Sequence, residues 1–289
     1  MATTFTNVAT LSYNGEQVRS NVTVGLIEGI LSVSKYAVNE QYGEGDTLTY
    51  VISIVNNSGE PVNGLTVNDD LGAYPFGTGT VQPLTFVENS LQYYQNGVLQ
   101  PDPAVKTTDG LILSDISVPA NGNAAIIYSA VVNAFAPLET GGSITNTVTA
   151  ESQTVTAVTA EESVAVTNEA QLSLVKSVTP IPVAENGELT YTFQLLNSGN
   201  TAVLDTENAV VTDTFSPALT GITAALDGTA LTDGVDYTYD EATGVFATAN
   251  GVLSIPAAAY TQDPVTGEWS MTPGSVTLTV TGRISTPSP

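Results

Sequence analysis

Apolar and polar residues alternate along many short stretches of the chain, and no stretch has a sustained helical period. Residues 48–54 (LTYVISI) and 276–280 (VTLTV) show this alternation. A period of two places one face of a β-strand in a core and the other in solvent. Asn-Gly, Asp-Gly, Ser-Gly and Pro-Gly pairs, which favour turns, separate the stretches. The pattern predicts an all-β protein in which many short strands form sandwiches or barrels.

The same series of short motifs occurs twice along the chain. Leu31-Ser-Val-Ser-Lys35 returns as Leu172-Ser-Leu-Val-Lys176, and Gly45-Asp-Thr-Leu-Thr-Tyr50 returns as Gly187-Glu-Leu-Thr-Tyr191. Further matches are Asn57-Ser-Gly59 with Asn197-Ser-Gly199, Leu65–Asp69 with Val210–Asp213, and Pro119–Gly122 with Pro273–Gly274. Ordered self-similarity indicates repeated structural units. We therefore predict two tandem β-sandwich domains, residues 29–168 and 169–289, after an N-terminal segment of residues 1–28.

The order of these motifs resembles the bacterial and archaeal surface "conserved repeat" domain, the eleventh family among the domains of unknown function. It is also similar to fimbrial domains that form internal isopeptide bonds. This resemblance implies immunoglobulin-like sandwiches on a cell surface, used as a stalk, an adhesin or a fibre subunit.

The two copies differ at their C-terminal ends. The first copy continues through residues 144–150 and 163–166, whereas the second stops soon after its matching strand, at residues 282–289. The second copy is therefore expected to lack its last one or two strands. A similar pattern occurs at the N-terminus, where residues 5–11 (FTNVATL) match residues 144–150 (ITNTVTA). If this segment supplies the missing strands to another domain, the residues expected to contribute are Phe5, Asn7, Ala9, Leu11, Val22 and Val24. We call them the donor residues.

An incomplete sandwich exposes an unpaired edge and an apolar slot, which a strand from another chain can fill. If residues 1–27 of one chain complete the second domain of the next, the contact is heterologous and repeats into a fibre. Two alternatives stay open. The hairpin could fold back onto its own second domain and close a monomer. The sequence could also be a segment of a longer surface protein, such as an adhesin stalk or a ligand-binding module.

Strand parity places three polar residues of each copy among apolar ones. Lys35 shares a face with Leu31 and Val33, and Lys176 shares one with Leu172 and Leu174. The same parity applies to Asp69, Asp213, Asn146 and Asn7. Burying a charged or amide group without a partner costs free energy, so the Lys, Asp and Asn side chains of each copy are expected to bind one another. A plain ionic and hydrogen-bonded cluster is one explanation, and an isopeptide bond is the other.

The resemblance to fimbrial domains implies how an isopeptide bond would form. The lysine amine attacks the asparagine carboxamide, the aspartate relays protons, and ammonia leaves. Burial is expected to lower the pKa of the lysine and raise that of the aspartate, so that a neutral amine faces a protonated acid. We expect Lys35 to pair with Asn146 and Asp69 inside the first copy. Lys176 and Asp213 are expected to pair with Asn7 of a neighbouring chain.

The amino-acid composition excludes several kinds of site and binding partner. The chain has 5 Lys and Arg against 29 Asp and Glu, a net charge of −24, and no His or Cys. This excludes disulfides, Cys/His zinc sites and His- or Cys-based catalysis, and it argues against binding to nucleic acids or anionic membranes. No segment is long and apolar enough to insert into a membrane.

Two remaining patterns suggest chemistry but lack the right geometry. Ser-x-x-Lys at residues 32–35 and 173–176 would need a helix, because on a strand the two side chains face opposite ways. The acidic residues Asp233, Asp236, Asp240 and Glu241 lack the spacing of a calcium loop. We expect no enzyme activity, cofactor or metal. The predicted function is a self-assembling, pilus-like structural fibre outside a bacterial cell or spore.

Overall fold

The structure is a computed structural model that describes residues 3–27 and 29–284. Within these residues the chain forms β-strands and one short 3-10 turn, η1 (Asp205–Glu207), which confirms the all-β prediction. The described part contains no helix that could span a membrane. The chain divides into two compact units: residues 1–136 with 143–165, and residues 137–142 with 166–289.

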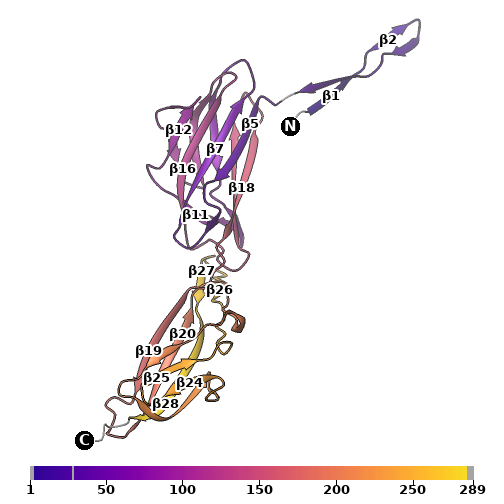
Figure 1. Ribbon diagram of the computed structural model, residues 1–289. Helices are drawn as coiled ribbons and strands as arrows, with labels where there is room; N and C mark the ends of the chain where they lie inside the picture. Colours follow the sequence, from indigo (N-terminus) through magenta and orange to yellow (C-terminus); the bar gives the residue numbers. More distant parts are fainter. Residues whose placement is uncertain (1–2, 28, 285–289) are drawn as a thin grey trace. The chain divides into compact units, whose positions relative to one another are not determined.

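The first unit contains a complete sandwich of two six-stranded sheets (Figure 1). One sheet has the order β13-β12-β16-β7-β5, with β11 also paired to β16, and the other has the order β14-β15-β8-β17-β18-β6. The first sheet consists of β5 (Leu31–Ala37), β7 (Thr47–Asn56), β11 (Leu84–Phe86), β12 (Gln92–Gln95), β13 (Val98–Leu99) and β16 (Asn123–Val132). The second consists of β6 (Gln41–Tyr42), β8 (Val62–Asp69), β14 (Ala104–Lys106), β15 (Leu111–Val118), β17 (Ser143–Glu151) and β18 (Val158–Val166). A small hairpin of β9 (Tyr74–Phe76) and β10 (Gly79–Val81) lies between β8 and β11 in the sequence.

The alternation read from the sequence is the alternation of burial. Along β7 and β16 every second residue is buried, so that Leu48, Tyr50, Ile52 and Ile54 face the core. These side chains pack between the two sheets, as expected for half-buried antiparallel strands.

The second unit has one full sheet and one reduced sheet. In the part of this unit that the structure describes, the full sheet has the order β19-β20-β28-β22-β23, and the reduced sheet has the order β21-β25-β24. The strands are β19 (Leu172–Thr179), β20 (Glu188–Asn197), β21 (Thr212–Thr214), β22 (Leu219–Leu226), β23 (Thr229–Ala230), β24 (Tyr237–Asp240), β25 (Val245–Thr248) and β28 (Gly274–Ile284), with a separate hairpin of β26 (Ala259–Gln262) and β27 (Trp269–Thr272). Among the described residues, β21 pairs with β25 and with no other strand. In the first unit β8, at the matching place, pairs with both β15 and β17.

The repeated Asn motif closes a turn in each sandwich. Asn56 and Asn197 are both buried, and the Nδ2 of each donates hydrogen bonds to backbone carbonyls across the turn. The structural equivalent of Asn197 is thus Asn56, one residue before the Asn57 that the sequence comparison aligned with it. The motif belongs to the scaffold, because its amide groups are used by the backbone.

One loop groups differently from the sequence-based domain limits. Residues 137–142, expected in the first domain, belong to the second unit. Asn200 of the second unit contacts this loop, because its Nδ2 donates to the carbonyls of Leu138 and Thr167, and its own carbonyl accepts a hydrogen bond from Thr140 Oγ1.

The N-terminal segment forms a hairpin of four short strands. They are β1 (Thr3–Asn7), β2 (Thr10–Tyr13), β3 (Glu16–Arg19) and β4 (Thr23–Ile27). Strand β1 pairs with β4 and β2 pairs with β3, and within the described residues they pair with no other strand. Asn14 and Gly15 form the turn with positive φ angles of 49° and 84°, as an Asn-Gly hairpin turn requires. A two-stranded hairpin without a packed face is at best marginally stable in water.

Candidate isopeptide sites and an open sandwich edge

The first copy brings Lys35, Asp69 and Asn146 into one buried cluster. Lys35 comes from β5 in one sheet, and Asp69 and Asn146 come from β8 and β17 in the other. Lys35 Nζ lies 2.6 Å from Asp69 Oδ2, and the two side chains are 0% and 1% exposed. The cluster therefore connects the two sheets through the core.

Tyr128 of β16 completes this cluster, and the sequence analysis did not single it out. Its Oη donates a hydrogen bond of 2.6 Å to Asp69 Oδ2 and accepts one of 3.0 Å from Asn146 Nδ2. The backbone N–H of Gly72 donates to Asn146 Oδ1 at 3.2 Å. A signal existed in the sequence, since parity in the Ile126-Ile-Tyr128 stretch turns Tyr128 inward, but a buried tyrosine is also an ordinary core residue.

Burial dominates the electrostatics of the first site. It lowers the pKa of Lys35 from 10.5, and the charge and hydrogen bond of Asp69 offset only part of that effect. It also raises the pKa of Tyr128 well above 10.0, to which the nearby charge of Asp69 adds. Lys35 Nζ lies 5.0 Å from the centre of the Tyr50 ring, which stacks on Tyr128 with 5.5 Å between ring centres. The surroundings therefore favour a neutral amine next to a neutral phenol.

The second copy repeats the ion pair but not the enclosure. Lys176 pairs with Asp213, and its Nζ lies 4.5 Å from the centre of the Tyr191 ring. The Lys176 side chain is 39% exposed, whereas that of Lys35 is 0% exposed. Val280 lies opposite Tyr191, in the place where Tyr128 lies opposite Tyr50. Among the described residues, Asp213 is the only hydrogen-bond partner of Lys176, and no described hydrogen bond joins Asp213 to a carboxamide or a tyrosine hydroxyl.

The apolar residues beside Lys176 are also uncovered. Leu31 is 4% exposed in the first copy, whereas its equivalent Leu172 is 54% exposed. Leu174 is likewise 54% exposed, although strand parity directs it to the core face. Within the described ranges, no strand of the second unit pairs with the edge of β21 that faces away from β25, and both leucines stay exposed.

This edge of β21 has no neighbouring strand among the described residues, in contrast to the matching edge of β8 in the first copy. In the first copy, the N–H of Asp70 donates to the carbonyl of Thr147 on β17 at 2.9 Å. Thr214 occupies the place of Asp70 in the second copy, and its N–H instead donates to Oδ1 of Asp213 at 2.9 Å. The backbone N–H at this position thus bonds to a side chain in the second copy, whereas in the first copy it bonds to a neighbouring strand.

The N-terminal hairpin presents the complementary property, exposed apolar residues. Phe5, Leu11, Val22 and Val24 are 51%, 68%, 57% and 68% exposed. Asn7 and Ala9 are exposed as well. The predicted donor residues therefore have no core around them in the described part of the chain.

Register divides the predicted donor residues between two faces. Asn7 lies opposite Thr23, and Phe5 lies opposite Gly25, so Val24 lies opposite Thr6 on the other face. Continuing the register of β2 and β3 would instead have placed Val22 opposite Asn7. One extra residue between the two ladders causes the change, because a one-residue shift exchanges the faces of a strand. A β-carbon on Gly25 would approach the Phe5 ring to 2.3 Å, so glycine lets that ring lie across the hairpin.

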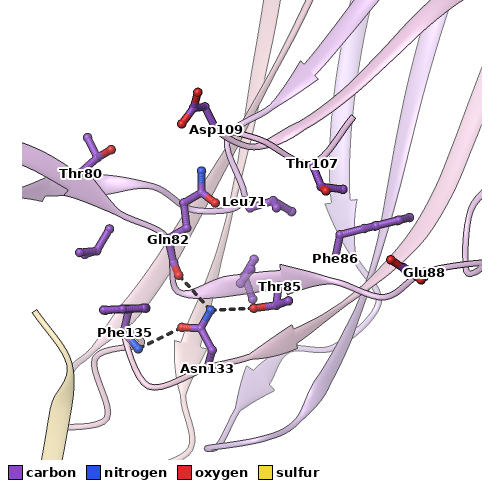
Figure 2. Close-up of a pocket in the computed structure, with 12 residues that line it drawn as sticks. Leu71, Thr80, Gln82, Thr85, Phe86, Glu88, Thr107, Asp109, Asn133 and Phe135 are labelled. Carbon is purple, nitrogen blue, oxygen red and sulfur yellow. Dashed lines mark hydrogen bonds between the residues drawn. The ribbon is translucent and has the colours of Figure 1, made fainter. Parts of the chain in front are cut away.

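A separate pocket of about 560 Å³ opens near β9–β11 of the first unit (Figure 2). Leu71, Phe86 and Phe135 are among its lining residues, together with Gln82, Asp109 and other polar groups. Figure 2 shows Asn133 bonded to the carbonyl of Gln82, to Thr85 Oγ1 and to the N–H of Phe135. None of the predicted isopeptide residues lines this pocket. No cluster of three or more Asp, Glu, His or Cys residues that could hold a metal ion occurs in the described ranges.

No protein-family profile matches the chain, so the resemblance to the "conserved repeat" domain is not confirmed in this way, and no curated protein matches it. Among solved structures, the chain is similar to BcpA, the major pilin subunit of Bacillus cereus (11% identity, TM-score 0.36, 96% of this chain and 74% of that chain). It is also similar to the pilus backbone protein RrgB of Streptococcus pneumoniae (12%, 0.33, 84% and 55%) and to the major pilin SpaA of Corynebacterium diphtheriae (12%, 0.29, 83% and 56%). The chain spans little more than half the length of the latter two. At these TM-scores the neighbours carry no inference about assembly.

Proposed function

We propose that this protein is a structural subunit of an extracellular, pilus-like fibre that assembles head to tail by strand donation. Residues 1–27 of one chain complete the second sandwich of the next. The observation that supports this most is the contrast between the copies, in which Leu31 is 4% exposed and Leu172 is 54% exposed. The exposed apolar hairpin in the same chain supplies the kind of strand that this opening lacks.

The first copy provides a template for how the donor would lie. There, Val148 of β17 lies opposite Asp69 of β8, and Asn146 stands two residues earlier. With residues 5–11 in place of residues 144–150, Ala9 lies opposite Asp213. Asn7 then stands toward Lys176 and Asp213 as Asn146 stands toward Lys35 and Asp69, and Phe5 and Leu11 enter the slot.

The covalent part of the proposal has two bonds. Lys35 and Asn146 form one inside the first sandwich, with the help of Asp69. Lys176 forms the second with Asn7 of the donor, with the help of Asp213, and this bond joins subunits. A plain ionic cluster is the alternative at both places, and the mass of the protein distinguishes the two because each amide bond releases one ammonia.

Negative-stain electron microscopy and denaturing gels test the proposal together. Purified full-length protein is expected to form fibres with a two-domain repeat, and boiled samples are expected to form a ladder of covalent oligomers. Asn7→Ala should remove the ladder and leave weaker, non-covalent fibres. Asn21→Ala, at an exposed asparagine of the same segment, is the matched control and should behave as wild type. Monodisperse particles at every concentration would contradict strand donation, and fibres without a ladder would contradict only the bond between subunits.

The pocket near β9–β11 favours a second candidate function, a ligand-binding surface module. Its two phenylalanine rings and its polar groups could hold a small polar-apolar ligand. Deletion of residues 1–27 separates the two functions, because it abolishes assembly if the chain is a fibre subunit and leaves ligand binding unchanged if it is a binding module.

A further inference from the structure

Tyr128 occupies the position between the acid and the carboxamide of the first cluster. Strand parity turns it into the core, and the β16–β7 register sets it opposite Tyr50. Its hydroxyl oxygen lies 2.6 Å from Asp69 Oδ2 and 3.0 Å from Asn146 Nδ2. It therefore connects the group that would relay protons to the nitrogen that would leave as ammonia.

Bond formation at this site requires a proton at that nitrogen. An amide nitrogen is a poor leaving group until it is protonated, and ammonia cannot depart otherwise. Asp69 accepts hydrogen bonds from Lys35 and Tyr128, and its Oδ1 accepts one from the N–H of Leu71. None of the described hydrogen bonds joins Asp69 directly to Asn146, so the path between them runs through Tyr128.

We propose that Tyr128 is a catalytic residue of the first cross-link, carrying the proton from Asp69 to Asn146 Nδ2 while the N–H of Gly72 holds Asn146 Oδ1. This inference rests on the isopeptide bond of the proposed function and adds to it a residue outside the Lys–Asp–Asn set. The lowered pKa of Lys35 supports it, since it makes the neutral amine available.

The step balances without an oxidant or a second reactant. Lys35 first passes one proton to Asp69 and becomes a neutral amine, which then attacks Cγ of Asn146. The Nζ–Cγ bond forms, and the carbonyl electrons move to Oδ1, where the N–H of Gly72 stabilises the negative charge. Nδ2 now has a free lone pair and changes from a donor toward Tyr128 into an acceptor.

Collapse of this intermediate completes the reaction. Tyr128 gives its hydroxyl proton to Nδ2 and takes one from Asp69, which recovers one from Nζ. The carbonyl forms again, the Cγ–Nδ2 bond breaks, and ammonia leaves. The products are one amide bond and one ammonia, with Asp69 protonated.

The second copy provides an internal comparison. Lys176, Asp213 and Tyr191 repeat three of the groups, but Val280 replaces Tyr128. If Tyr128 transfers the proton, the bond inside the first sandwich should form faster than the bond between subunits.

The test follows cross-linking in full-length chains made by cell-free synthesis, quenched in acid at intervals and measured by intact mass. Wild type is expected to lose one ammonia, while Tyr128→Phe loses it at least about a hundredfold more slowly, the scale of a general acid–base group. Tyr93→Phe is the matched control, because the Tyr93 hydroxyl is buried in the same sandwich but bonds to the backbone of Ser117. It should cross-link as fast as wild type.

A second variant separates proton transfer from folding. Fluorotyrosine at position 128 keeps the shape of the ring but is a stronger acid, so bond formation should become faster and its pH profile should change. A purely structural hydroxyl would leave both unchanged. Equal rates in wild type and Tyr128→Phe, or an unchanged rate with fluorotyrosine, would overturn the role of Tyr128 alone. A wild-type mass that retains every ammonia would overturn the cross-link itself, and the role of Tyr128 with it.

Discussion

Truncating Leu31 and Leu172 separately tests whether the second sandwich is open in the free subunit and closed in the fibre. A Leu→Ala change at a fully buried site costs about 3 kcal/mol. Leu31 is 4% exposed, so Leu31→Ala should lower the unfolding free energy of the first domain by about that full amount. Leu172 is 54% exposed, so Leu172→Ala should cost the free subunit only about 1.4 kcal/mol.

The rest of the Leu172 contribution should appear on assembly. If the donor strand covers the exposed half of the side chain, Leu172→Ala removes about 1.6 kcal/mol of donor binding, which is about a fifteenfold change. The concentration needed for fibres should rise by that factor, while Leu31→Ala should leave it nearly unchanged.

Urea unfolding of dilute, unassembled protein and light scattering across a concentration series measure the two effects. A Leu172→Ala protein that loses as much stability as Leu31→Ala in the free state would mean that the slot is already filled within one chain. A Leu172→Ala protein that assembles at the wild-type concentration would mean that this face does not receive the donor.

Three further predictions follow from the same contacts. In an Asn146→Ala chain no bond can form at Lys35, and the folded domain binds fewer protons than the unfolded chain between the lowered pKa of Lys35 and 10.5. Urea titrations below about pH 9 should therefore show stability rising with pH, and a fall would contradict the assignment. Above that pH the raised pKa values of Tyr50 and Tyr128 act in the opposite direction, because the folded domain keeps protons that the unfolded chain loses. Phe5→Ala should raise the concentration needed for assembly by roughly tenfold, because its exposed half is worth about 1–2 kcal/mol when buried, and unchanged light scattering would remove Phe5 from the donor. Asn56→Ala and Asn197→Ala should each destabilise their own domain by about 2–3 kcal/mol, since buried carbonyls lose their donors, and calorimetry should show only one of two transitions moving.

Residue alternation predicts burial well in the first sandwich, where both sheets that surround a strand belong to the same domain. Alternation along β7 predicts which residues face the core, and it turns Lys35, Asp69 and Asn146 inward, where the structure buries them. The contribution of Tyr128 could not be read in the same way, because burial alone does not separate a core tyrosine from a functional one.

Two features depend on information that a local pattern does not contain. Parity predicts the face of Leu172 and Lys176 but not whether a strand covers that face, and the structure leaves both side chains exposed. The face of Val24 depends on a one-residue irregularity in the hairpin, and alternation cannot place such an irregularity because a single slip reverses every side chain.

Disulfide trapping with single-cysteine chains tests strand donation most directly, because the natural sequence contains no cysteine. In the first copy Thr149 lies opposite Asn68, so the donor residue Thr10 should lie opposite Thr212 of the next chain. The account predicts that a Thr10→Cys chain mixed with a Thr212→Cys chain forms a disulfide-linked heterodimer under mild oxidation. The same partner mixed with Thr238→Cys, on the opposite edge of the three-stranded sheet, should form little. Equal trapping at both positions, or none at Thr212→Cys in samples that contain fibres, would contradict donation of the hairpin to this edge.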